Sequence, residues 1–218
     1  MDSNKIKHNL KGLYLVLDPS LEMNQLIQKL KSALEGGVSI VQIWNNWPSL
    51  ITTSGKIEII NEIIKASNIY QVPVLINEEY ALLNETDLAG VHFDQIPDSF
   101  EEVRSVITSD KIIGITCGND LDRIEWANEN QIDYLSFCSI FPSKSAGECE
   151  IVSKETLERA KSITQIPFFV SGGITIENLT ELSSYGISGA AVISGVLSAA
   201  SPKEKSQEYN QVLNKIIQ

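Results

Sequence analysis

The feature that most constrains the fold is a regular alternation of short apolar runs with segments of helical periodicity. The apolar runs recur at intervals of roughly 20 to 30 residues. Continuous apolar runs of this kind are typical of parallel strands that are buried on both faces. We predict eight such strands, in residues 13–17, 38–43, 73–76, 90–93, 112–116, 134–137, 167–174 and 189–193. Helical patterns follow them in residues 21–35, 57–64, 80–84, 99–106, 121–130, 153–162, 176–185 and 202–217.

Eight strand–helix units account for almost the whole chain and leave little room for a second domain. A doubly wound open sheet would give the same alternation of elements. That fold usually carries a GxGxxG turn after its first strand, whereas this chain has Asp18-Pro19-Ser20 there. We therefore predict an α/β fold, a single (β/α)₈ TIM barrel over residues 1–218.

Small residues follow the last two predicted strands. Gly172 and Gly173 end the seventh strand, and Ser194 and Gly195 follow the eighth. Residues without a bulky Cβ substituent let backbone N–H groups approach an anion closely. The loops after strands seven and eight are where many (β/α)₈ barrels bind phosphate. The pattern therefore predicts a phosphorylated small-molecule ligand.

Charge and composition exclude several other classes of function. The net charge is −11 and the sequence pI is about 4.7, so we expect no nucleic-acid partner and no docking on an anionic membrane. No signal peptide or membrane span is predicted, and the three cysteines suit free thiols in a reducing compartment, so we expect a cytoplasmic protein. The sequence leaves the oligomeric state open, a homo-oligomer included.

Several loop residues have two interpretations. The carboxylates Glu78, Glu79, Asp94 and Asp98 could supply oxygen ligands for Mg²⁺ or be solvated loop charges. Lys144 lies in a long loop and could close over a phosphate or be a solvated lysine. Trp44 and Trp47 could stack on a flat heterocycle or fill space under a loop. His92 could be an acid/base or a core histidine with satisfied hydrogen bonds.

The segments, taken in order, resemble the thiamine-phosphate synthase family, which includes the thiazole tautomerases. The resemblance covers nearly the whole chain. It rests on residues 13–18, 33–42, 73–78, 89–93 with Gln95, 133–134, 141–143, 166–167 with 172–174, and 192–194. The synthase of that family joins an aminopyrimidine diphosphate to a thiazole phosphate and releases pyrophosphate, with Mg²⁺. The chemistry that this implies is positioning and neutralisation of the leaving group, with no protein nucleophile.

The resemblance also implies roles for individual residues. On the pyrimidine side it implies Gln42, Asn77, Thr116 and Lys144. For the phosphate it implies Ser143, Ser145, Gly172, Gly173, Ile193 and Ser194. For the metal it implies Glu78 and, more weakly, Asp98. No catalytic residue is assigned.

The chain departs from the family pattern at the diphosphate end. The family has Gln-x-Arg-Glu-Lys after the second strand, whereas this chain has Trp44 and Asn46 at the two cationic positions. Pro97 stands where the second metal aspartate is expected, and the lysine of the loop after the sixth strand is displaced to Lys144. The tautomerase histidine after the fifth strand is missing from Thr116-Cys117-Gly118-Asn119.

Three readings of the function follow. The first is a synthase-type transferase with altered diphosphate contacts. The second is a relative without synthase activity that binds a thiazole or thiamine phosphate as a sensor or carrier. The third is an isomerase or lyase acting on a phosphorylated small molecule, with His92 or a carboxylate as the acid/base.

Overall fold

The computed structural model describes residues 10–142 and 150–217, and within them the strands close into one parallel barrel in chain order. The strands are β1 (Gly12–Leu17), β2 (Ile40–Ile43), β3 (Val74–Asn77), β4 (Gly90–Phe93), β5 (Ile112–Thr116), β6 (Tyr134–Cys138), β7 (Phe168–Ser171) and β8 (Gly189–Val192). The barrel closes where β1 pairs with β8, with Gly12 opposite Gly189 and Leu15 opposite Val192. The predicted (β/α)₈ barrel is confirmed.

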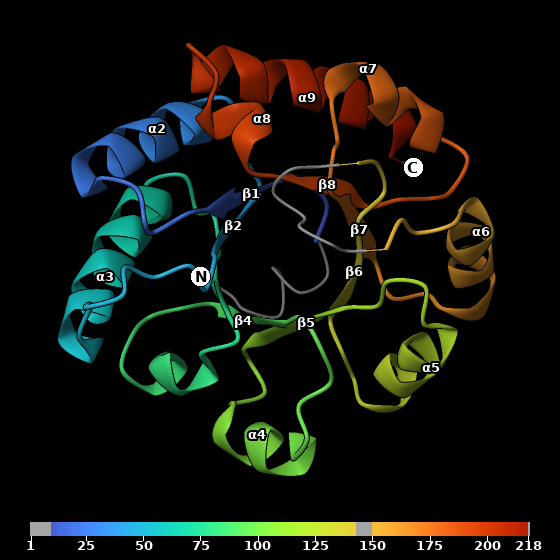
Figure 1. The fold of residues 1–218 in the computed structure, drawn as a ribbon, viewed down its shortest axis with the longest axis horizontal. Coiled ribbons are helices and arrows are strands. Elements are labelled where there is room, and N and C mark those ends of the chain that lie inside the picture. The colour runs from blue at the N-terminus through green and yellow to red at the C-terminus, as the bar shows by residue number, and fades with distance from the viewer. Residues whose placement is uncertain (1–9, 143–149, 218) are drawn as a thin grey trace.

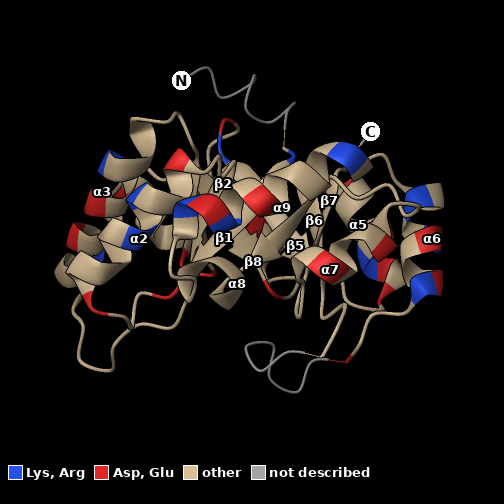
Figure 2. Ribbon diagram, turned by 90° about the horizontal axis from the view of Figure 1, so that it is seen from above, with Lys and Arg blue, Asp and Glu red and all other residues tan. Residues whose placement is uncertain are grey.

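Helices form a ring around the strands (Figure 1). They are α2 (Met23–Glu35), α3 (Thr53–Asn68), α4 (Phe100–Val106), α5 (Leu121–Glu129), α6 (Lys154–Ile163), α7 (Ile176–Leu179), α8 (Ser194–Leu197) and α9 (Pro202–Ile216), with 3₁₀ turns η1 (Tyr80–Asn84) and η2 (Thr180–Leu182). The last helix, α9, packs beside α2, so the end of the described chain completes the ring next to its beginning. Basic and acidic residues are interspersed along these helices (Figure 2).

The helical predictions need three corrections. The helix expected in residues 176–185 is α7 followed by η2. The segment after β3 forms the 3₁₀ turn η1, which has only five residues and no side-chain cap. The short helix α8, directly after β8, was not predicted, because four residues are too few to show helical periodicity.

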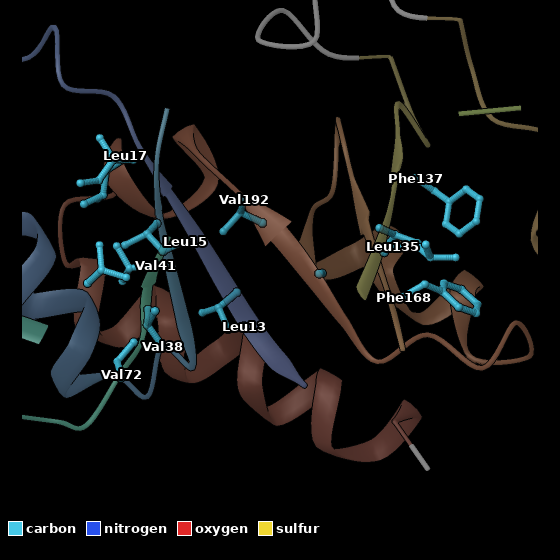
Figure 3. Packing of buried hydrophobic residues seen from close by; sticks show 14 of the residues in the cluster. Leu13, Leu15, Leu17, Val38, Val41, Val72, Leu135, Phe137, Phe168 and Val192 are labelled. Carbon is cyan, nitrogen blue, oxygen red and sulfur yellow. The ribbon is translucent and has the colours of Figure 1, made fainter. Parts of the chain in front are cut away.

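The apolar residues form two separate cores, one outside and one inside the barrel. Leu13, Leu15 and Leu17 of β1 are fully buried in the outer core between strands and helices, where Figure 3 shows them with other strand residues of this core. Tyr14 faces the opposite way, because successive side chains of a strand alternate between its faces. The interior cluster consists of Leu10, Tyr14, Ile40, Leu75, Ile112, Tyr134, Phe169 and Ala191.

Helix ends follow their sequence signals. Ser153 caps α6 by accepting a hydrogen bond from the Thr156 N–H, and Asp120 caps α5 in the same way through Arg123. Among the helices of residues 10–142 and 150–217, none is long and apolar enough to cross a membrane.

Candidate functional site

The inward-facing side chains change from apolar to polar toward the C-terminal ends of the strands. Ile40 and Leu75 belong to the interior apolar cluster. Gln42 and Asn77 lie two residues further along the same strands and therefore face the same way. Thr116 ends β5 at the same level of the barrel. These side chains give the barrel mouth, where active sites of this fold lie, a polar floor.

A chain of four hydrogen bonds crosses this floor. The Tyr14 hydroxyl donates to Gln42 Oε1 at 2.5 Å and lies 2.8 Å from the Tyr134 hydroxyl. Tyr134 is in turn 2.8 Å from His92 Nδ1, and His92 Nε2 is 2.9 Å from Thr116 Oγ1. Strands β2, β1, β6, β4 and β5 each supply one residue of this chain. It therefore links two of the predicted pyrimidine-side residues, Gln42 and Thr116, through three residues for which no such role was predicted.

The three central groups of the chain are neutral at pH 7. Burial raises the pKa values of Tyr14 and Tyr134 well above their ordinary value. Burial lowers the pKa of His92 to about 4, and the charge of Asp94 opposes this effect. Both His92 ring nitrogens already have partners, so His92 is a satisfied core histidine. An acid/base role would require it to break one of these bonds.

The Asn77 side chain connects two neighbouring segments at the barrel mouth. Its side chain is buried, donates to the His92 carbonyl at 3.2 Å and accepts from the Asn45 N–H at 3.3 Å. These bonds tie the loop after β2 to strand β4. Asn77 therefore lies at the predicted place, but its amide is already bonded to backbone groups.

The predicted metal ligands, Glu78 and Asp98, differ in their surroundings. Glu78 accepts from the Asp94 N–H at 2.6 Å, and burial raises the pKa of this carboxyl. Asp98 is exposed, next to Pro97. Within the described residues, no group of three or more His, Cys, Asp and Glu side chains could hold a metal ion. Magnesium stays a prediction that would need oxygen ligands from the substrate.

The loop after β2 uses its side chains for packing and local hydrogen bonds. Trp47 is partly buried against the outer core, and the Lys56 ammonium lies 5.2 Å from the centroid of its ring. Lys56 also forms an ion pair with Glu79. Asn46, at one of the family's cationic positions, donates to Asp18 at 3.0 Å. Trp47 thus fills space under the loop, in agreement with the simpler interpretation of this residue.

Arg123 is a cation at the mouth that the sequence reasoning missed. Its Nη1 donates to the Thr116 carbonyl at 2.7 Å and to the Asp94 carbonyl at 3.3 Å. It therefore ties together the ends of β4 and β5. The signal that could have found it is its place in the first turn of the helix after β5, within reach of the strand end.

The predicted phosphate end has the expected backbone. Gly172 and Gly173 have positive φ angles of 81° and 66°, a region that side-chain-bearing residues avoid. A Cβ on Gly173 would lie 2.7 Å from the carbonyl oxygens of Phe141 and Pro142. Ile193 immediately precedes α8, and Ser194 is its first residue. Strands β7 and β8 are paired neighbours, so these turns share one side of the mouth.

Three predicted site residues, Ser143, Lys144 and Ser145, lie outside the described residues. So does the third cysteine, while Cys117 is a buried free thiol.

A hollow of about 280 Å³ lies at the opposite end of the strands, away from these residues. Val74, Asp87 and Ile112 contribute to its lining, and Lys111 in its wall donates to the Leu88 carbonyl at 2.8 Å. We assign the site to the mouth instead, because the polar floor and the glycine turns meet there.

Comparisons with known proteins agree with the fold and identify the family. Residues 13–196 match the model of a family described as thiamine monophosphate synthase. A thiamine-phosphate synthase of Clostridium perfringens is 32% identical over 215 residues, covering 98% of this chain and 100% of that protein. One from Methanobrevibacter smithii is 30% identical over 199 residues, covering 90% and 92%. The structure of a thiamine phosphate pyrophosphorylase from Pyrococcus furiosus superposes with a TM-score of 0.81 at 21% identity, covering 96% of this chain and 98% of that one.

The structural likeness, at that identity, supports the barrel fold alone, whereas the sequence matches extend through the site loops. With a family model that spans most of the chain and relatives at 30% identity or more over nearly their full length, the chain belongs to the thiamine monophosphate synthase family.

Proposed function

We propose that this protein joins an aminopyrimidine diphosphate to a thiazole phosphate and releases pyrophosphate. The observation that carries the proposal is the near-full-length similarity to curated thiamine-phosphate synthases. The barrel mouth supports it, since a polar floor and a glycine-lined turn lie at the same end of the strands.

The reaction requires positioning more than it requires a nucleophile from the protein. The bond between the pyrimidine methylene carbon and the diphosphate oxygen breaks, and its electron pair leaves with pyrophosphate. The thiazole nitrogen then uses its lone pair to form the new carbon–nitrogen bond. In this proposal the floor orients the pyrimidine ring, and the turns at Gly173 and Ser194 hold the thiazole phosphate. Fixing both partners in one mouth removes much of the entropic barrier to their reaction.

One observation favours a second candidate, a relative that binds the thiazole or thiamine phosphate without turnover. Trp44 and Asn46 replace the two cations that the family has after its second strand. Asn46 bonds to Asp18, and Lys56 in the following helix is paired with Glu79. A hydrogen bond to a charged group contributes about 1.5–3 kcal/mol, so the loss of these cations would slow departure of the diphosphate.

Turnover by the purified protein tests the proposal directly. With both substrates and Mg²⁺, we expect formation of thiamine phosphate and pyrophosphate in equal amounts, measured by chromatography. The variant that carries both Trp44→Arg and Asn46→Lys should raise kcat/KM by about tenfold or more, the effect of one such charge-assisted contact. A matched control adds the same charges at two exposed positions of α2, through Gln25→Lys and Gln28→Arg, and should leave the rate unchanged.

Absence of product from both the folded wild-type protein and the recharged variant would contradict the synthase proposal. Tight binding of thiazole phosphate by the same preparations would then support the second candidate.

The phosphate end has its own prediction. Gly173→Ala should weaken binding of thiazole phosphate by about tenfold, because the positive φ and the two carbonyl oxygens near the new methyl group force this turn to move. Isothermal titration calorimetry measures the effect. Gly186→Ala is the control: Gly186 also has a positive φ, of 74°, but its nearest neighbours are methylene groups of Lys161 on the outer layer. If Gly173→Ala bound thiazole phosphate as tightly as wild type does, the proposal that the phosphate binds at this turn would be wrong.

A further inference from the structure

The hydrogen-bond chain across the barrel floor ends on two side chains that face the mouth, Gln42 and Thr116. We propose that all its hydrogen bonds point one way, so that the Gln42 amide turns its oxygen to Tyr14 and its N–H donors to a ligand, while Thr116 offers the ligand only oxygen lone pairs. This polarity selects an amino-substituted pyrimidine over the corresponding oxo-substituted ring. Tyr14, Tyr134 and His92 are then positioning residues that determine specificity. The choice of ligand rests on the proposed function, whereas the direction of the chain does not.

The direction begins at the Gln42 amide. Its Oε1 can only accept, so the Tyr14 hydroxyl must donate to it. The single hydroxyl proton of Tyr14 is then used, and the contact of 2.8 Å with Tyr134 requires Tyr134 to donate. The Tyr134 proton is used in turn, so its oxygen can only accept from His92 Nδ1. Each step leaves one arrangement, because a hydroxyl has one proton.

The tautomer of His92 determines the direction of the last hydrogen bond, to Thr116. A neutral imidazole has one N–H, and here Nδ1 carries it, so Nε2 is a bare acceptor. Burial, which lowers the pKa of His92, keeps the ring neutral. Thr116 must therefore donate its hydroxyl proton to Nε2 across the contact of 2.9 Å. Its oxygen keeps only lone pairs for a ligand.

The two ends of the chain describe a ligand. The Gln42 amide nitrogen has two N–H donors, which suit an unprotonated ring nitrogen. The Thr116 oxygen suits the N–H of an exocyclic amino group. An aminopyrimidine has both features, whereas an oxo-pyrimidine replaces the amino group with a carbonyl and protonates a ring nitrogen. The protonated ring nitrogen would place an N–H against the Gln42 N–H donors, and the carbonyl would place an oxygen against the Thr116 lone pairs. Either mismatch leaves a polar group without a hydrogen-bond partner.

The opposite orientation of the Gln42 amide predicts the opposite ligand preference. If the Gln42 amide were turned so that its nitrogen donated to Tyr14, every bond in the chain would reverse. His92 would carry its proton on Nε2, and Thr116 would donate to the ligand. The floor would then favour the oxo ring. The proton position on His92 therefore reports the direction of the whole chain.

Nitrogen NMR of the imidazole measures that position without any ligand. The sequence has only two histidines, so a His8→Gln variant leaves His92 alone. At pH 7.5, about one unit above the ordinary pKa of histidine, we expect the ¹⁵N shifts of the Nδ1–H tautomer. In the additional variant Tyr134→Phe this preference should be lost. A ring with its proton on Nε2 in the His8→Gln protein would overturn the proposed direction.

Binding selectivity tests the specificity. Wild type should bind the aminopyrimidine diphosphate at least about tenfold more tightly than its oxo analogue, the value of one mismatched hydrogen bond. Tyr134→Phe should reduce this ratio to about one while retaining the aromatic packing against Tyr14 and Phe169. Tyr14→Phe is a second break in the chain with the same expected result. Tyr185→Phe, in the outer core, should keep the wild-type ratio.

The outcomes separate this inference from the proposed function. Tight binding of both rings without preference would overturn the selectivity and leave the synthase reaction standing. A wild-type ratio retained by Tyr134→Phe and Tyr14→Phe would show that these residues do not set it. Binding of neither ring would contradict the proposed function and the selectivity together, while the NMR result would still decide the direction of the chain.

Discussion

Gly114→Ala is expected to lower the free energy of unfolding by about 3 kcal/mol, the upper end of the range for overpacked cores. A Cβ at this position of β5 would lie 2.0–2.6 Å from three atoms of the Tyr134 ring. That ring cannot retreat, because Tyr14, His92 and Phe169 all pack against it within the barrel. The substitution should also break the hydrogen-bond chain, since moving the ring moves its hydroxyl. Urea denaturation measures the loss.

Gly55→Ala is the matched control for this experiment. Gly55 lies in the first turn of α3, and the atoms nearest its added methyl group belong to the side chains of Ile51 and Thr52. Because alanine is favoured over glycine in a helix by about 0.5–1 kcal/mol, this variant should match or exceed wild-type stability. If the free energy of unfolding of Gly114→Ala were within about 0.5 kcal/mol of the wild-type value, the Tyr134 ring would have room to move away from the added methyl group, contrary to this prediction.

His92 should make the stability of the protein fall as the solution is acidified. An unfolded histidine takes up a proton below about pH 6.5, whereas the folded protein resists protonation until about pH 4 because the ring is buried. Between these values the unfolded state binds more protons, so the free energy of unfolding decreases as pH falls. The full difference corresponds to roughly 3 kcal/mol, lost between pH 7 and pH 4.

A pair of variants isolates this contribution. Urea denaturation of His8→Gln and of His8→Gln with His92→Gln is compared across that pH range. The second protein should start less stable at pH 7, because its buried hydrogen bonds are disrupted, and should lose less stability on acidification. Glu78, whose pKa is raised by burial, opposes the trend but is present in both proteins. Parallel curves for the two proteins would contradict a neutral, buried His92.

The barrel could be predicted because its signal is local and repeated. Each apolar run is a strand buried on both faces, and the repeat of strand and helix indicates the closed sheet. The turn after β7 could be predicted for the same reason, because two consecutive glycines, Gly172 and Gly173, indicate a backbone with positive φ angles.

The polar floor could not be predicted, because its partners are distant in the chain. Tyr14 and Tyr134 each lie inside an apolar run, where an aromatic residue reads as ordinary core, and 120 residues separate them. Their hydrogen bond depends on which strands become neighbours across the barrel and on the level at which each ring lies. The conformation of the loops could not be predicted either, because nothing in the local sequence pattern shows that the Glu78 carboxylate accepts a hydrogen bond from the Asp94 N–H.

The barrel interior is filled by pairing large rings with missing side chains. The Tyr134 ring occupies the space beside Gly114, and the Phe169 ring lies 2.5 Å from the place of a Cβ on Gly189, which the Gly12 carbonyl oxygen also blocks at 2.1 Å. Neither member of such a pair can change alone without a clash or a void. Over evolutionary time positions 114 and 134 are therefore expected to covary, so a relative with a larger residue at position 114 would need a smaller one at 134. Any such relative would also lack the tyrosine hydroxyl, and by the inference above its pocket would lose the preference for the amino-substituted ring.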